Sequence, residues 1–105
     1  MSPNPATSVQ HFEYGTVYQV TVTHADRLKT LNSAIITDLR RAFDEISHDT
    51  DARVVVLRGD GDRAWIGGAD IREMAELDSV SAREFITHLH HLCAAIRETH
   101  LPVVA

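Results

Sequence analysis

The apolar residues of this chain fall into strand-like and helix-like stretches that alternate. Residues 16–23, TVYQVTVT, are rich in β-branched side chains and alternate in part, so we predict a strand there. From residue 32 onward, in NSAIITDLRRAFDEISHD, apolar residues recur at helical spacing, and Asn32 or Ser33 is a suitable N-cap. The positions that share the apolar face of this predicted helix are Ile35, Ile36, Leu39, Phe43 and Ile46.

The second half of the chain repeats this order. Residues 52–59, ARVVVLRG, form a continuous apolar run, which is typical of a strand covered on both faces in a parallel sheet. After a glycine-rich turn we predict a short helix from Ile71 to about Glu76. Ser81 and Glu84 match a capping box and predict a longer helix. The apolar face of that helix would carry Phe85, Ile86, Leu89, Leu92, Cys93 and Ile96.

The last residues, THLPVVA, begin another predicted strand with Pro102 as its first residue. The order strand, helix, strand, helix, strand predicts an α/β fold of repeating βα units. We expect residues 1–13 to be a loose segment and residues 14–105 to be part of one domain that breaks off within a strand.

Composition narrows the classes of function. The formal net charge is −5, and no basic stripe is present, which argues against a nucleic-acid partner. No apolar run approaches the ~18 residues of a membrane span, and the N-terminus lacks a secretory signal. Cys93 is the only cysteine, so no intrachain disulfide can form, and we expect a cytoplasmic protein without a membrane partner.

Residues 59–64, GDGDRA, match the G-x-G-x-x-A fingerprint of dinucleotide-binding folds. Two aspartates and an arginine crowd this motif, and the aspartates would repel a pyrophosphate. A tight polar turn is therefore the favoured interpretation. A nucleotide-binding α/β module built on GDGDRA stays an alternative, and it predicts that the next helix begins at Gly61 rather than at Ala69.

The histidines of HLHH are the other polar cluster. His88 and His91 are three residues apart on one predicted helix face, but zinc needs three or four ligands and no second cluster is present. We therefore predict no metal site and interpret these histidines as a solvated flank of the helix. Cys93 is interpreted as a core residue.

The stretch WIGGADIREM, residues 65–74, places two glycines directly before a predicted helix. Gly67 and Gly68 have no Cβ, so the chain can turn sharply and a ligand can approach the backbone. N–H groups near Ala69 would then point outward at the positive end of a helix dipole and could stabilise a developing oxyanion. One such donor is worth roughly 3–4 kcal/mol of barrier in other enzymes. The residues alone leave open an ordinary strand–turn–helix junction.

Three segments, in order, resemble the enoyl-CoA hydratase/isomerase family, the crotonase superfamily. DARVVVLRGDGDRAWIGGADIREM is similar to the family's strand, glycine turn and GAD-[IL]-x-E-M motif. HADRLKTLNSAIITDLRRAFDEI is similar to its N-R-P-x-x-x-NAL segment, and THLPVVA to its KPVIAAVNG strand. The resemblance covers about residues 14–105 and is more specific for the superfamily than for the reaction.

The resemblance implies a crotonase-like spiral of ββα units that holds an acyl-CoA thioester. The family polarises the thioester carbonyl with two backbone N–H groups, and the first corresponds to Ala69 here. The implied reaction is hydration or double-bond isomerisation through an oxyanion-stabilised enolate, with coenzyme A as part of the substrate and no separate cofactor. The residues implied to contact the coenzyme A thioester are Lys29, Thr30, Leu31, Gly67, Gly68, Ala69, Asp70, Ile71 and Arg72.

The same resemblance implies that the second oxyanion donor and the acid/base residues follow the last strand. We do not assign an acid/base role to Glu73 or Glu76, and we expect residues 1–105 alone not to turn over enoyl-CoA at an enzymatic rate. The complete protein is implied to be a homotrimer or hexamer. A non-catalytic fragment that binds a partner through its uncovered core is a further alternative.

Overall fold

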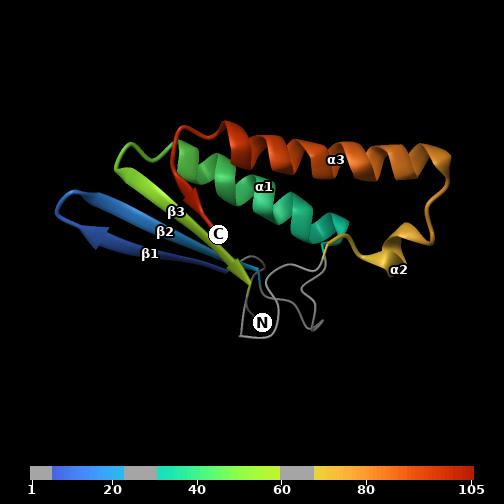
Figure 1. Ribbon diagram of the computed structural model, residues 1–105, viewed down its shortest axis with the longest axis horizontal. Helices are drawn as coiled ribbons and strands as arrows, with labels where there is room; N and C mark the ends of the chain where they lie inside the picture. The colour runs from blue at the N-terminus through green and yellow to red at the C-terminus, as the bar shows by residue number, and fades with distance from the viewer. Residues whose placement is uncertain (1–5, 23–30, 60–67) are drawn as a thin grey trace.

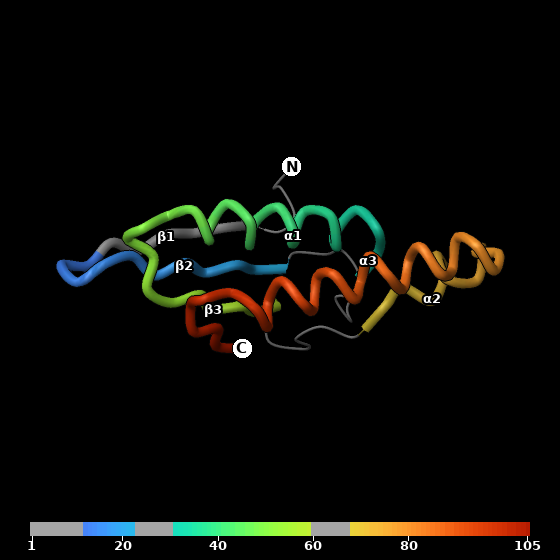
Figure 2. The backbone as a smooth tube through the Cα atoms, turned by 90° about the horizontal axis from the view of Figure 1, so that it is seen from above, coloured from blue at the N-terminus to red at the C-terminus, as the bar shows by residue number. Residues whose placement is uncertain are grey.

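The computed structural model describes residues 6–22, 31–59 and 68–105, with side chains from residue 12 onward. One layer is a four-stranded sheet, and two long helices, α1 (Ser33–Ser47) and α3 (Ser79–Glu98), cover one of its faces (Figure 1). Seen from above, α1 lies over the first strands and α3 runs beside it over the third (Figure 2). The predicted α/β class is confirmed.

The first two strands form an antiparallel hairpin. Strand β1 (Ala6–Phe12) pairs with β2 (Gly15–Val22), with Phe12 opposite Gly15 at the turn. The prediction of a loose segment over residues 1–13 is therefore wrong for residues 6–12. The sequence ATSVQHF has no clear apolar alternation, and its register depends on pairing with β2 across a short turn.

Gly15 permits the close approach of this hairpin to the rest of the sheet. Its φ angle is 143°, a conformation that side-chain-bearing residues rarely adopt. A Cβ at this position would lie 2.4 Å from Cγ of Arg53 and 2.8 Å from the carbonyl oxygen of Asp51. The N–H of Thr16 donates to the same Asp51 carbonyl at 2.8 Å, so β2 begins in direct contact with the loop before β3.

A second contact ties this loop to β2. The hydroxyl of Tyr18 donates to Oδ2 of Asp49, while Oδ1 of Asp49 accepts the N–H of Asp51 at 2.9 Å. The hydrogen bond to Asp49 raises the pKa of Tyr18 above its ordinary value, because the phenolate would lose the donated proton and face a carboxylate. The loop is thus held by a tyrosine that stays protonated at neutral pH.

The remaining strands are parallel. Strand β3 (Ala52–Gly59) pairs with β2 on one side and with β4 (Val103–Val104) on the other, in the order β1-β2-β3-β4. Val55 and Leu57 of β3 are buried under the helices, whereas Val54 and Val56 are only half-buried. The expectation of cover on both faces is wrong for the described residues, because α1 and α3 lie on the same face of the sheet.

Helix α1 supplies most of the core between the layers. It starts at the predicted cap, where the side chain of Asn32 accepts the N–H of Ile35 at 2.9 Å. All the residues predicted for its apolar face are buried, which confirms the helical pattern. With Ala42 added, the buried residues of α1 are Ile35, Ile36, Leu39, Ala42, Phe43 and Ile46.

Two further helices follow β3. The short helix α2 (Ile71–Met74) ends earlier than predicted and contains no buried residue. Helix α3 starts earlier than predicted, because Asp78 is its N-cap and Ser81 is the third helical residue of the capping box. The Asp78 carboxylate accepts the Ser81 N–H at 2.8 Å, and this hydrogen bond, with one from the Ser81 hydroxyl, lowers the pKa of Asp78. The Ser81 hydroxyl accepts the Asp78 N–H at 3.0 Å, which completes the capping box.

The apolar face of α3 is narrower than predicted. Phe85 and Leu92 are buried, and Leu89 and Ile96 pack against the core. Ile86 is 52% exposed, and Cys93 is also exposed, so the interpretation of Cys93 as a core residue is wrong. Ile86 and Cys93 are seven residues apart, which places them together on the shoulder of the helix rather than beneath it.

Candidate active site

Two backbone hydrogen bonds join Leu31 to the GAD motif. The N–H of Leu31 donates to the carbonyl of Gly68 at 2.6 Å, and the N–H of Asp70 donates to the carbonyl of Leu31 at 2.8 Å. They form an isolated parallel bridge between Leu31 and Ala69. In such a bridge the N–H and C=O of the central residue point away from the partner. The chain is therefore fixed on both sides of Ala69 without use of the Ala69 N–H.

This bridge replaces the helix start as the device that orients Ala69. Ala69 precedes Asp70, the N-cap of α2, and α2 has only four residues. So short a helix has a small dipole. The sequence interpretation located the junction between turn and helix correctly, but the partner that holds it is Leu31, which lies far away in the sequence. Leu31 is 8% exposed, so its side chain anchors the bridge in the core and only its backbone faces the motif.

Gly68 provides the turn into the bridge. Its φ angle is 112°, which an L-residue with a side chain rarely adopts. No atom of the described residues lies within 4 Å of the position that a Cβ would take. The prediction that glycine is required here for backbone geometry is supported at Gly68, whereas Gly67 lies outside the described residues.

The other predicted contact residues of the motif have different environments. Asp70 is 9% exposed, and its carboxylate accepts the Arg72 N–H at 2.9 Å as the N-cap of α2. Arg72 also places Nε 3.7 Å from Oδ1 of Asp70, with its side chain largely in solvent. Ile71 is 78% exposed. The Asp70 side chain thus has a structural task, while Ile71 and Arg72 face the surroundings. Lys29 and Thr30 lie outside the described residues.

Sequence reasoning missed the role of Glu73. Its Oε2 accepts the N–H of Ser33 at 3.0 Å, and its Oε1 accepts the Ser33 hydroxyl. These bonds join α2 to the first turn of α1 across forty positions of the chain. The spacing of residues carries no signal for this pair, because neither residue belongs to an apolar pattern and the contact depends on the Leu31 bridge.

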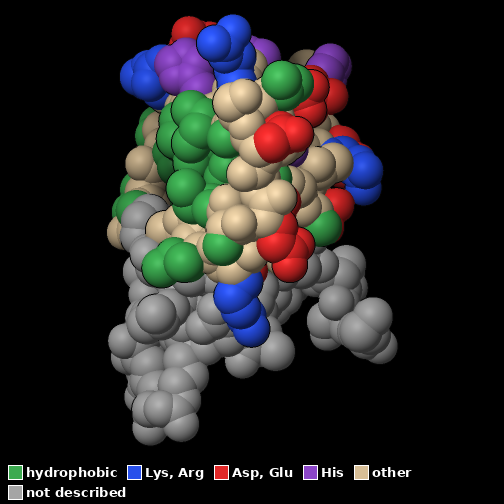
Figure 3. Space-filling model, turned by 90° about the vertical axis from the view of Figure 1, so that its right-hand side faces the viewer, with side chains coloured by type: hydrophobic (Ala, Val, Ile, Leu, Met, Phe, Trp, Pro, Cys, Tyr) green, Lys and Arg blue, Asp and Glu red, His purple; other side chains and the backbone are tan. Residues whose placement is uncertain are grey.

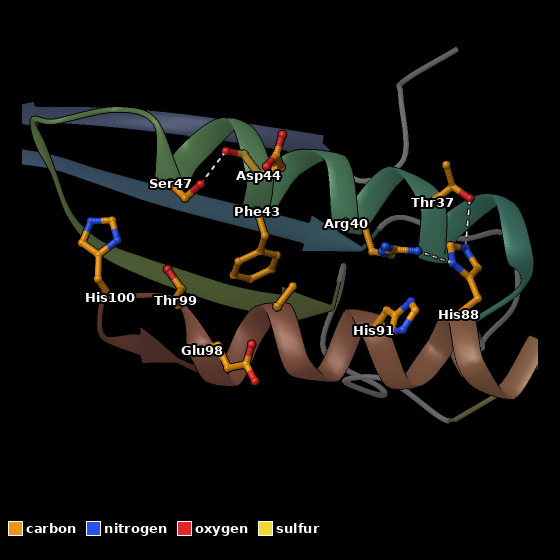
Figure 4. Close-up of a pocket in the computed structure, with 11 residues that line it drawn as sticks. Thr37, Arg40, Phe43, Asp44, Ser47, His88, His91, Glu98, Thr99 and His100 are labelled. Atoms are coloured by element: carbon orange, nitrogen blue, oxygen red, sulfur yellow. Dashed lines mark hydrogen bonds between the residues drawn. The ribbon is translucent and has the colours of Figure 1, made fainter.

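The predicted histidine flank contacts α1 instead of facing only solvent. Nη1 of Arg40 lies 2.8 Å from Nδ1 of His88, and Oγ1 of Thr37 lies 3.1 Å from Nε2. Because a guanidinium only donates, Nδ1 accepts and the ring proton is on Nε2. His88 and His91 line an open cavity of about 570 Å³ between α1 and α3, with Phe43 in its middle and Arg40 beside His88 (Figure 4).

The described residues bring together no three His, Cys, Asp or Glu side chains that could hold a metal ion. Within the same residues, neither long helix combines the length and apolar character that a membrane span requires. The first described helix after β3 begins at Ile71, two residues after Ala69. Residues 60–64 of GDGDRA lie outside the described residues.

Apolar side chains are exposed at the end of the molecule that carries α2. Ile71, Met74 and Val80 are 78%, 42% and 67% exposed. Viewed from this end, apolar side chains gather on the surface, with acidic side chains along one border (Figure 3). The residues that follow the candidate backbone donor in the sequence therefore contribute an exposed apolar surface.

Comparisons of the sequence and of the structure with known proteins both point to enoyl-CoA hydratases. The model of the family described as enoyl-CoA hydratase/isomerase matches residues 13–105. A short-chain-enoyl-CoA hydratase of Clostridium acetobutylicum is 34% identical over 71 residues, which are 68% of this chain and 27% of that protein. A probable enoyl-CoA hydratase of Mycobacterium tuberculosis is 32% identical over 89 residues, covering 82% of this chain and 34% of that protein.

Solved structures resemble the chain over nearly its whole length. An enoyl-CoA hydratase/carnithine racemase from Magnetospirillum magneticum has a TM-score of 0.79 and 31% identity, covering 92% of this chain and 38% of that one. An enoyl-CoA hydratase from Mycobacterium smegmatis has a TM-score of 0.81 and 27% identity, covering 95% of this chain and 38% of that one. The chain thus spans about a third of the length of the relatives that it matches.

Proposed function

Because the chain belongs to the enoyl-CoA hydratase/isomerase family and has its crotonase-like ββα fold, we propose that it is the part of an acyl-CoA-processing protein that supplies a backbone oxyanion donor. The donor is the N–H of Ala69. The observation that supports this assignment is the Leu31 bridge, which uses the neighbouring Gly68 carbonyl and Asp70 N–H and leaves the Ala69 N–H out of the pairing.

The proposed chemistry follows from what a fixed N–H can do. When a nucleophile adds to an enoyl thioester, or a proton leaves its α-carbon, electrons move onto the thioester oxygen and form an enolate. A donor that is already oriented stabilises this charge without reorganisation in the transition state. We propose this role for Ala69 in hydration or in double-bond isomerisation, with the acyl-CoA as the substrate.

We propose neither Glu73, in α2, nor Glu76, just beyond the end of α2, as the acid or base. Both oxygens of Glu73 accept hydrogen bonds from Ser33, so neither is available to take a substrate proton without breaking that contact. Glu76 lies in solvent beyond the helix. A general acid or base contributes roughly 10²–10⁴-fold to a rate, so we expect residues 1–105 alone to show no enzymatic turnover of crotonyl-CoA.

The proposal is tested by removing the donor in a protein that carries these residues together with the remainder of a family domain. Ala69→Pro abolishes the N–H and should lower turnover of crotonyl-CoA by roughly 10²–10³-fold, with a smaller change in binding. Ala69→Ser retains the N–H and should have a mild effect. Circular dichroism of both variants checks the fold. A folded Ala69→Pro protein with nearly full activity would show that GGAD is only a turn.

One observation favours the non-catalytic alternative, namely the exposed apolar surface of Ile71, Met74 and Val80. Such a surface is typical of a contact with another protein segment. If Ala69→Pro leaves activity intact while Met74→Glu abolishes a monodisperse complex in gel filtration, the interaction role replaces the catalytic one.

A further inference from the structure

The GAD segment has a second anchor besides the Leu31 bridge. We infer that Glu73 is a positioning residue for the Ala69 backbone donor, an inference that rests on the proposed function of Ala69. Glu73 acts through Ser33, and it does not touch the reacting atoms. Its carboxylate holds α2 against the start of α1 and thereby sets the backbone of residues 68–70 relative to the core.

The Ser33–Glu73 contact is stronger than an ordinary surface hydrogen bond. Ser33 is the first residue of α1, where a helix leaves its N–H groups without intrahelical partners. Glu73 satisfies this N–H and also accepts the hydroxyl of the same residue. Both bonds have an ionised acceptor, and the carboxylate lies at the positive end of a fifteen-residue helix. The interaction is therefore directional and partly buried.

Helix α2 needs such an anchor because the core does not hold it. None of its four residues is buried, and Ile71 and Met74 are exposed. A single helical turn is marginal in water unless tertiary contacts stabilise it. The N–H of Met74 donates to the carbonyl of Asp70 at 3.0 Å, so this turn connects Glu73 rigidly to the residue that follows Ala69.

The residues that receive the GAD segment are consecutive. Leu31 makes the backbone bridge, Asn32 caps α1, and Ser33 donates to Glu73. The bridge restrains the chain at Gly68 and Asp70, and Glu73 restrains it one helical turn later. The Ala69 N–H belongs to the same peptide plane as the Gly68 carbonyl, so the bridge sets its direction, and the Glu73 contact holds the following turn so that the bridge stays formed.

Substitutions on both sides of the contact test the inference in the 105-residue chain. Glu73→Gln removes the charge and keeps the shape of the side chain. Ser33→Pro removes both donors, and proline is favourable at the first position of a helix. Asn32 has φ −102° and ψ 176°, which suits a residue before proline. Glu76→Gln is the matched control, because Glu76 is an exposed acid two residues beyond the end of α2.

The readout is the amide hydrogen exchange of Leu31 and Asp70, the two donors of the bridge. Glu73→Gln and Ser33→Pro should each raise it about tenfold, while the amides of Leu39 and Phe43 inside α1 keep their rates. Glu76→Gln should change neither set of exchange rates. In the Ser33→Pro/Glu73→Gln double variant, the exchange of Leu31 and Asp70 should rise no further than in the more strongly affected single variant. The positioning role would be overturned if the exchange of Leu31 and Asp70 did not change, if it rose equally in Glu76→Gln, or if exchange became faster throughout α1.

A separate signal reports on the proposed function. In the wild-type chain, crotonyl-CoA should shift the amide resonance of Ala69, and in Glu73→Gln the shift at equal ligand concentration should be smaller. If crotonyl-CoA does not shift the Ala69 amide resonance of the wild-type chain, the proposed function is overturned, whatever the exchange rates are. Wild-type exchange rates in Glu73→Gln overturn the role of Glu73, whatever crotonyl-CoA does.

Discussion

Gly15 and Gly68 adopt similar positive φ angles, 143° and 112°, in the β1–β2 turn and in the turn before α2. At Gly15 the space of a Cβ is occupied by Cγ of Arg53 and the Asp51 carbonyl. At Gly68 no atom of the described residues comes within 4 Å of that space. The hairpin uses glycine so that two chain segments can touch, whereas among the described residues only the positive φ angle calls for glycine at Gly68.

The two turns also differ in how deeply the neighbouring residues are buried. The hairpin turn belongs to the sheet, and its neighbour Thr16 is 3% exposed. The turn at Gly68 leads into α2, which has no buried residue and depends on the Leu31 bridge and the Glu73 contact. The comparison teaches that global stability and site geometry rest on different interactions in this chain, so they can be perturbed separately.

The largest effect on stability is expected from Gly15→Ala. The substitution combines an unfavourable φ with a collision against backbone, and it should lower the free energy of unfolding by roughly 2–5 kcal/mol. Urea unfolding followed by circular dichroism measures this loss. Glu13→Ala, an exposed change in the same turn, should stay within about 0.5 kcal/mol of the wild type. A Gly15→Ala protein as stable as Glu13→Ala would remove the packing role of this glycine.

Gly68→Ala should cost less, because only the φ angle is unfavourable and no described atom opposes the methyl group. We expect a loss of about 1–2 kcal/mol in the same unfolding experiment. Hydrogen exchange of Leu31 and Asp70 should respond more than exchange within α1. If Gly68→Ala destabilises the chain as much as Gly15→Ala does, the difference between the crowded and the open turn does not hold.

Tyr18→Phe gives the smallest of the three effects and is specific to the hairpin side. It removes the donor to Asp49, whose loop carries the Asp51 carbonyl that crowds Gly15, and should cost about 1 kcal/mol for one partly exposed hydrogen bond.

The pH dependence of this contribution follows from the raised pKa of Tyr18. The folded chain retains the phenolic proton more strongly than the unfolded chain, so the contribution is complete below the unfolded pKa of about 10. It is lost as the pH rises through the raised folded pKa. The difference in unfolding free energy between wild type and Tyr18→Phe should therefore shrink from pH 9 upward, and a constant difference would contradict the assignment.

The residues that sequence reasoning placed correctly are those with a strong local pattern. The strand around Tyr18, Val20 and Val22, the apolar face of α1 and its cap at Asn32 all follow from spacing and propensity. The start of the short helix at Ile71 was also located correctly, because two adjacent glycines before a helical pattern are a local signal. These features depend on residues within one or two turns of each other.

The features that sequence reasoning missed depend on distant partners. Strand β1 exists because β2 offers it an edge, and Cys93 is exposed because the helices meet along a narrower line than the apolar pattern of α3 allows. The bridge between Leu31 and Ala69 uses backbone atoms, which every residue possesses, so it cannot be predicted from residue types. The sequence predicts no role for Glu73, because its partner, Ser33, is forty positions away along the chain.

The bridge, the cap and the Glu73 contact occupy Leu31, Asn32 and Ser33 in succession, and this leaves the tripeptide no freedom in length. A residue inserted between Leu31 and Ser33 would turn the start of α1 by about 100° relative to the bridge, so that the cap and the Glu73 contact could not both form. A deletion would remove one of the three roles outright. Across related sequences we therefore expect side chains to vary at these positions more readily than spacing, and alignment gaps to fall outside the tripeptide.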